Sequence, residues 1–152
     1  MSIEKRLDDL EIVLPKVAAP VAAYVPAVKA DKIVYTAGQI ALVEGDLKYK
    51  GRLGEDLSVE DGYKAAGICA LNALAAVKSV ADSLDNVERI LRITGYVNSS
   101  PDFTDQPKVV NGASELVQKI FGEAGRHARS AVGVNTLPLG ACVEVEIIAL
   151  LK

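Results

Sequence analysis

Residues 128–151 read ARSAVGVNTLPLGACVEVEIIALL, and their pattern is the clearest in the chain. Two β-rich runs, 129–136 and 141–151, flank the connection LPLG, whose proline and glycine are typical of a tight turn. The second run begins by alternating valine with glutamate, which is the two-residue period of a half-buried strand. The two runs together predict an antiparallel hairpin.

The position of the turn also predicts a register for this hairpin. A turn centred between Pro138 and Leu139 gives three pairs: Gly133 with Glu144, Ala131 with Glu146, and Arg129 with Ile148. Paired residues share a face of the sheet, so the arginine and both glutamates would lie together beside small residues. The opposite face would carry an apolar core set: Ser130, Val132, Val134, Val143, Val145 and Ile147. The first face is typical of a small anion site with an acid–base group, although charges on a non-core face are more commonly just solvated.

The segments upstream complete the order of elements. Residues 58–83 predict a long helix with a wide apolar face, which Ser58-x-x-Asp61 opens as a near capping box. Residues 87–99 predict a strand, and a second helix follows from Asp105 and Pro107 to about Gly122. Extended runs are expected at 22–29 and 31–42, after a short helix at 2–11. The order β-β-α-β-α-β-β predicts an α+β fold with helices packed on one face of a mixed sheet.

Composition limits the class of protein. A chain of 152 residues fits one domain, 1–152. The net charge of −3 and the absence of a Lys/Arg block indicate neither nucleic-acid nor membrane-surface binding. Cys69 and Cys142 lie in apolar runs without metal-ligand spacing, so we expect buried thiols, a reducing compartment and no metal site. The charged N-terminus is typical of neither a signal peptide nor a membrane anchor, which favours a cytoplasmic protein.

Four short blocks occur in a characteristic order along the chain. They are Tyr24-Val25, the run 35–40 (YTAGQI), Val110-Asn111, and residues 128–149. In this order they resemble the Rid/YjgF family, the reactive intermediate deaminases, also labelled endoribonuclease L-PSP or translation initiation inhibitor. The resemblance covers roughly residues 17–151 and leaves 1–16 as an N-terminal extension.

The resemblance implies a chorismate-mutase-like fold and a homotrimer with three clefts between neighbouring subunits. It also implies hydrolysis of reactive enamine or imine acids to 2-keto acids and ammonia, without a metal or organic cofactor. The expected ligand is therefore a small carboxylate or imino acid.

The resemblance also assigns roles to individual residues. Arg129 matches the carboxylate-binding arginine, whose planar guanidinium suits a bidentate grip on a carboxylate. Glu144 matches the glutamate that positions the attacking water and accepts its proton. The backbone N–H of Gly38 would help to hold the substrate carboxylate, because a residue without a side chain permits close approach.

Four further positions would line the cleft. Tyr24 and Asn111 match cleft-lining residues, although Tyr24 is equally consistent with a packing aromatic and Asn111 with a brace for the second helix. Ala37 and Ala131 replace the serine and cysteine that are frequent in deaminase members, which makes the expected pocket less polar. This loss favours either a different, bulkier substrate or weak turnover.

Other functions stay open at this stage. A trimer that binds a small carboxylate without turnover is the main alternative to the deaminase, because polar groups are missing at Ala37 and Ala131. Endoribonuclease activity has little support, since the chain is acidic and has few aromatics and one histidine. Chorismate-mutase chemistry would rest on fold similarity alone.

The single histidine, His127, is interpreted as a loop residue without a legible serine or cysteine partner. Asn72 is interpreted as a structural hydrogen-bonding residue.

Overall fold

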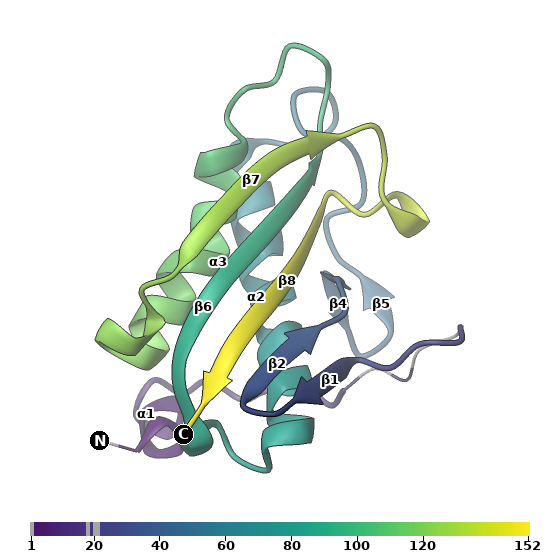
Figure 1. The fold of residues 1–152 in the computed structure, drawn as a ribbon. Helices are drawn as coiled ribbons and strands as arrows, with labels where there is room; N and C mark the ends of the chain where they lie inside the picture. The colour runs from purple at the N-terminus through teal and green to yellow at the C-terminus, as the bar shows by residue number, and fades with distance from the viewer. Residues whose placement is uncertain (1, 18, 20–21) are drawn as a thin grey trace.

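The computed structural model describes residues 2–17, 19 and 22–152 as one main sheet with two long helices against it (Figure 1). The helices are α1 (Ile3–Asp9), α2 (Val59–Ala81) and α3 (Gln106–Phe121). The strands of the main sheet are β1 (Ala27–Ala30), β2 (Ile33–Thr36), β3 (Gln39–Ile40), β6 (Val87–Asn98), β7 (Ala128–Val134) and β8 (Val143–Leu151). A separate two-stranded ribbon is formed by β4 (Leu42–Val43) and β5 (Asp46–Leu47). The predicted α+β class, with helices on one face of a mixed sheet, is confirmed.

The predicted terminal hairpin is wrong. The strand order is β1-β2-β8-β6-β7, so β6 separates β7 from β8. β6, α3 and β7 form a β-α-β unit, in which β7 returns parallel to β6 along its outer edge. β8 then pairs antiparallel with the other edge of β6. The LPLG connection therefore crosses the end of β6, where Asn98 Nδ2 donates to the carbonyl of Ala141 at 3.1 Å, instead of turning one strand back onto the other.

The two long helices form a single layer on one face of the sheet. The capping box of α2 is confirmed, since Ser58 Oγ accepts from the Asp61 N–H and the Asp61 carboxylate accepts from the Ser58 N–H. α2 is long and apolar enough to span a membrane by composition, but 56% of its most apolar window is buried inside the protein. It is therefore a core helix, as predicted. α3 has Pro107 in its first turn and begins at Gln106, next to Asp105.

Glycine lets α2 and α3 approach each other closely. A Cβ on Gly112 of α3 would collide with the backbone carbonyl of Tyr63 in α2. Gly67 of α2 lies at the same crossing but has room, since its Cβ would meet the Gly112 oxygen at 3.6 Å. The crossing fixes the position of α3, and with it the polar side chains of Asn111 and Ser114.

The N-terminal helix α1 is attached to the ends of the helix layer. The Glu4 carboxylate accepts from Lys78 Nζ at 2.8 Å and from the Leu84 N–H at 3.0 Å. Asp85 in turn accepts from the Ser2 hydroxyl and from the first N–H groups of α1. These contacts join the first turn of the chain to the connection between α2 and β6.

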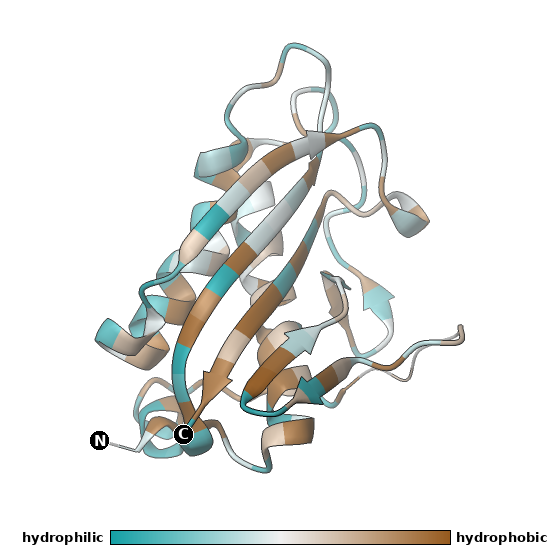
Figure 2. Ribbon diagram, in the orientation of Figure 1, coloured by the Kyte–Doolittle hydropathy of each residue, from teal (hydrophilic) through white to brown (hydrophobic). Residues whose placement is uncertain are grey.

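Among the residues that the structure describes, no helix covers the opposite face of the main sheet (Figure 1). Buried and half-buried residues alternate strictly along β8. Hydrophobic and hydrophilic residues alternate along its first half, whereas its second half is hydrophobic throughout (Figure 2). The side chains facing the helices are Val143, Val145, Ile147, Ala149 and Leu151, and those on the helix-free face are Glu144, Glu146, Ile148 and Leu150. Several apolar side chains lie exposed on that face, including Tyr35 and Val132.

Candidate functional site

Arg129 lies on the edge strand β7, on the face that carries the helices. Its register partner in β6 is Ile93, which itself pairs with the buried Ile147 of β8. The guanidinium reaches α3, where Nη1 donates to Asn111 Oδ1 at 2.8 Å and to Ser114 Oγ at 3.2 Å. Asn111 therefore holds the arginine, as a brace between α3 and β7.

A cavity of about 310 Å³ opens beside this arginine. Its lining is Asn111, Ser114, Glu115, Gln118, His127 and Arg129. We refer to Asn111, Ser114, His127 and Arg129 as the arginine half of the site. A guanidinium has five N–H donors in one plane, so Arg129 keeps donors for a ligand after binding Asn111 and Ser114.

His127 lies in the loop before β7, as predicted, and the structure gives it a serine partner that was not legible in the sequence. Its Nε2 lies 2.9 Å from Ser114 Oγ, and its Nδ1 lies 2.6 Å from the carbonyl oxygen of Gly125. Burial lowers the pKa of His127, and the charge of Arg129 lowers it further against the opposing effect of the Gly125 carbonyl. Asn111 and Ser114 share a helix face through their three-residue spacing, which is the one sequence signal for this cluster.

Glu144 lies on the other face of the sheet. Its register partner in β6 is Tyr96, and its carboxylate packs over Gly38, where an added Cβ would collide with Oε1. Burial raises the pKa of Glu144, and the charge of the neighbouring Glu146 raises it further. Glu146 is held by the Tyr96 hydroxyl, which donates to it at 2.9 Å. We refer to Gly38, Tyr96, Glu144 and Glu146 as the glutamate half.

The predicted clustering of Arg129 with Glu144 and Glu146 in one chain is therefore wrong. Both glutamates face away from the helices, whereas Arg129 faces them. The predicted register failed because each strand pairs with β6 and not with the other. In the observed register Gly95 pairs with both Ala131 and Val145, so Arg129, Ala131 and Gly133 share the face of the buried valines.

The remaining predicted residues divide between the two halves. Ala131 is half-buried and packs against the core next to Arg129. Ala37 precedes Gly38, and its N–H donates to the carbonyl of Pro26 at 2.8 Å, which ties the Tyr24 segment to the glutamate half. Tyr24 itself is 53% exposed. Asn72 has the predicted structural role, since its Nδ2 donates to the carbonyls of Ile40 and Leu42.

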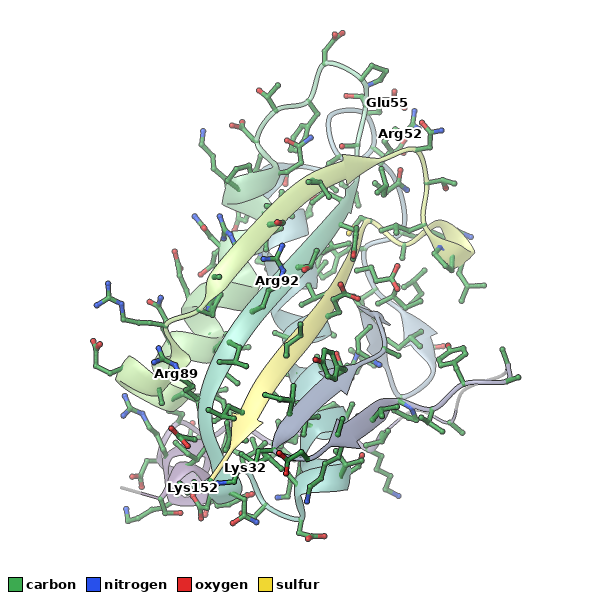
Figure 3. The ribbon with its side chains drawn as sticks, viewed as in Figure 1. Lys32, Arg52, Glu55, Arg89, Arg92 and Lys152 are labelled. Atoms are coloured by element: carbon green, nitrogen blue, oxygen red, sulfur yellow. The ribbon has the colours of Figure 1, made fainter. Side chains whose placement is uncertain are left out.

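Arg92 is a further cation that the sequence did not single out. It lies near the middle of the sheet in Figure 3, and its Nη2 donates to Ser130 Oγ of β7 at 2.7 Å on the helix-free face. Among residues 2–17, 19 and 22–152, no three His, Cys, Asp or Glu side chains are grouped to hold a metal ion. The polar groups available to a ligand are thus a guanidinium, an imidazole, a hydroxyl, carboxylates and backbone N–H groups.

The fold places the chain in a known class of small α+β protein. Residues 4–151 match the family model described as "YjgF/chorismate mutase-like, putative endoribonuclease", and the chain belongs to this family. It is 42% identical to Protein TCP17 of Trypanosoma cruzi over 145 residues, and the aligned region covers 95% of this chain and 91% of that protein. It is 32% identical to the RutC family protein UK114 of Drosophila melanogaster, over 88% of this chain and 83% of that protein. A crystal structure from Shewanella oneidensis, described as a "putative endoribonuclease", superposes with a TM-score of 0.95 at 36% identity, covering 99% of this chain and all of that one.

Proposed function

We propose that the protein hydrolyses reactive imine or enamine acids to 2-keto acids and ammonia in clefts between the subunits of a homotrimer. The observation that carries the proposal is the braced guanidinium of Arg129 beside a cavity of about 310 Å³. A braced, half-buried arginine suits bidentate binding of a substrate carboxylate. Family membership supports the same activity, because hydrolytic deamination is what the Rid/YjgF resemblance implies.

The separation of the two half-sites supports an assembly. Arg129 and Glu144 lie on opposite faces of one sheet, so a site that uses both needs the arginine half of one subunit and the glutamate half of the next. The helix-free face supplies an apolar surface for such contacts, since Tyr35 and Val132 are 49% and 44% exposed in the isolated chain. A closed, symmetric assembly would cover this surface.

The chemistry needs little beyond orientation and one base. Water adds to the C=N carbon as its proton passes to the Glu144 carboxylate, and Glu144 returns this proton to the nitrogen to give a carbinolamine. Glu144 then takes the carbinolamine hydroxyl proton and passes it to the nitrogen, so that the C–N bond breaks, ammonia leaves and the C=O bond of the 2-keto acid forms. The raised pKa of Glu144 makes its ionised form a stronger proton acceptor. Binding the substrate on Arg129 while Glu144 holds water would supply most of the acceleration by proximity.

The test is a coupled assay in which an amino-acid oxidase generates imines of several side-chain sizes, with semicarbazide trapping the imine that escapes hydrolysis. We expect faster imine loss with the wild-type protein and loss of that acceleration in Arg129→Ala. Arg129→Lys should also lose most of it, because an ammonium lacks the fork geometry. Arg126→Ala is the matched control, since Arg126 is an exposed cation three residues away that pairs with Glu123.

A carboxylate-binding trimer without turnover is the second candidate, and the apolar residues Ala37 and Ala131 near the two halves favour it. Titration calorimetry with a panel of 2-keto acids separates the two. Arg129-dependent binding together with no acceleration for any imine would reject the deaminase and support the binding module. The family description also mentions endoribonuclease, but the net charge of −3 does not favour a polyanionic substrate.

A further inference from the structure

The hydrogen bonds around Ser114 determine where each proton lies. A carbonyl oxygen only accepts, so the contact with Gly125 requires the proton of the neutral His127 ring to be on Nδ1. Nε2 is then an acceptor. A guanidinium only donates, so Ser114 Oγ accepts from Arg129 and donates its own proton to His127.

This arrangement is that of an activated nucleophile. The base His127 lies within hydrogen-bond reach of the hydroxyl at 2.9 Å, and a third group, the Gly125 carbonyl, orients the base. The positive charge of Arg129, 3.2 Å from Ser114 Oγ, stabilises the negative charge that develops as the proton leaves. Burial lowers the pKa of His127, which favours the neutral imidazole that a general base requires.

We propose that Ser114 is the nucleophile of an acyl-transfer site, with His127 as its general base and Arg129 as its anion-binding group. The substrate class is small carboxylic esters that carry a second, anionic group. The proposal goes beyond imine hydrolysis and uses no residue of the glutamate half. It concerns a pair of side chains, Ser114 and His127, for which the family resemblance implies no role.

Ester cleavage proceeds through an acyl-serine intermediate. Ser114 Oγ bonds to the ester carbonyl carbon while its proton moves to His127 Nε2. The C–O bond to the alcohol then breaks, and the alcohol leaves with the proton from His127. Water hydrolyses the acyl-serine by the same route in reverse, with His127 accepting a proton from water and returning it to Ser114.

The residues around Ser114 and His127 favour a substrate of limited size and negative charge. The cavity of about 310 Å³ beside Ser114 suits a short acyl chain. Glu115 lies at its rim, held by the Tyr63 hydroxyl. On its other side, His127 borders a depression of about 380 Å³ lined by Arg89 and Arg126. Arg126 pairs with Glu123, so three cations and two carboxylates lie around the cavity and the adjoining depression. The remaining net positive charge favours an anionic substrate.

The test is covalent labelling of the full-length protein with a fluorophosphonate, located by peptide mass spectrometry. We expect one adduct, on Ser114, that is absent in Ser114→Ala and forms at least 100-fold more slowly in His127→Ala. Ser130→Ala is the matched control, because Ser130 also binds an arginine but has no histidine partner. Its labelling should equal that of the wild type.

Hydrolysis of two chromogenic esters tests the role of the anion. The wild type should prefer 4-nitrophenyl hydrogen succinate to 4-nitrophenyl acetate by at least tenfold in kcat/KM, and Arg129→Ala should remove that preference. Glu144→Gln should retain labelling at Ser114 even if it abolishes imine hydrolysis, so failures of the two proposals are distinguishable. An unlabelled Ser114 in folded protein, or equal labelling in His127→Ala, would overturn the proposal and leave Ser114 as a brace for Arg129.

Discussion

The crossing of α2 and α3 gives a sharp test of the packing that positions the arginine half. Gly67 of α2 and Gly112 of α3 face each other at this crossing, but only Gly67 has room for a methyl group. On Gly112 the added Cβ would lie 2.8 Å from the carbonyl carbon of Tyr63 and 3.1 Å from its Cα, besides colliding with the oxygen. Because the obstacle is backbone, the two helices must move apart.

The magnitudes follow from two opposing effects. Replacing a mid-helix glycine by alanine favours the helix by about 1 kcal/mol. Overpacking against an immobile neighbour opposes it by about 3 kcal/mol, so Gly112→Ala should lose about 2 kcal/mol. In Gly67→Ala the methyl meets only an ordinary contact at 3.6 Å, so that variant should gain about 1 kcal/mol.

Thermal and urea unfolding followed by circular dichroism measure both variants. For a chain of this size, Gly112→Ala should lower Tm by about 4–8 °C and Gly67→Ala should raise it by about 2–4 °C. Gly112→Ala should also weaken ligand binding at Arg129, because Asn111 and Ser114 move with α3. A Gly112→Ala protein as stable as Gly67→Ala would refute the packing argument.

Three further predictions concern other parts of the molecule. Burial opposes ionisation of Glu4, but hydrogen bonds and charge from Lys78 and neighbouring groups outweigh burial and lower the pKa of Glu4. Glu4→Gln should therefore reduce the free energy of unfolding by about 0.5–1 kcal/mol at pH 7. Urea unfolding of both proteins at several pH values measures this loss, which should vanish as the pH falls through the pKa of Glu4. A difference between wild type and variant that stays constant with pH would argue against the ion pair. Burial raises the pKa of Cys142 to about 12 and that of Cys69 well above its usual value. A thiol reagent should therefore modify both cysteines only in denaturant. Rapid modification of the native protein would contradict the burial of these thiols. In the trimer that we propose, the helix-free face supplies the subunit contacts, so Ile148→Arg should shift the sedimentation coefficient to that of a monomer. An unchanged coefficient would contradict this placement of the contacts.

Local patterns in the sequence predicted most of the elements. The capping box at Ser58 and Asp61 placed the start of α2, and Pro107 placed α3, because these signals act within one helical turn. The alternation along residues 143–151 identified β8 and correctly separated its glutamates from its valines. Such signals lie within a few residues of one another, so they can be recognised without knowing which elements pack together.

The candidate site was predicted as a list of residues but not as an arrangement. Arg129 and Asn111 do meet, and Glu144 does pack over Gly38. The pairing of Ser114 with His127 was missed, because the two lie thirteen residues apart on different elements and meet only when α3 packs against β7.

The α+β class, the helix boundaries and the resemblance to the family are readable from the chain alone, because periodicity, capping and ordered blocks are local properties. The partner of each strand depends on how distant segments pack together. The sequence of residues 128–151 is compatible with a hairpin, yet both of its strands pair with β6. The β-α-β unit through α3 places β7 parallel to the outer edge of β6, and β8 pairs with the other edge of β6. This insertion puts Arg129 and Glu144 on opposite faces, since the face of a strand residue depends on the register of its actual partner.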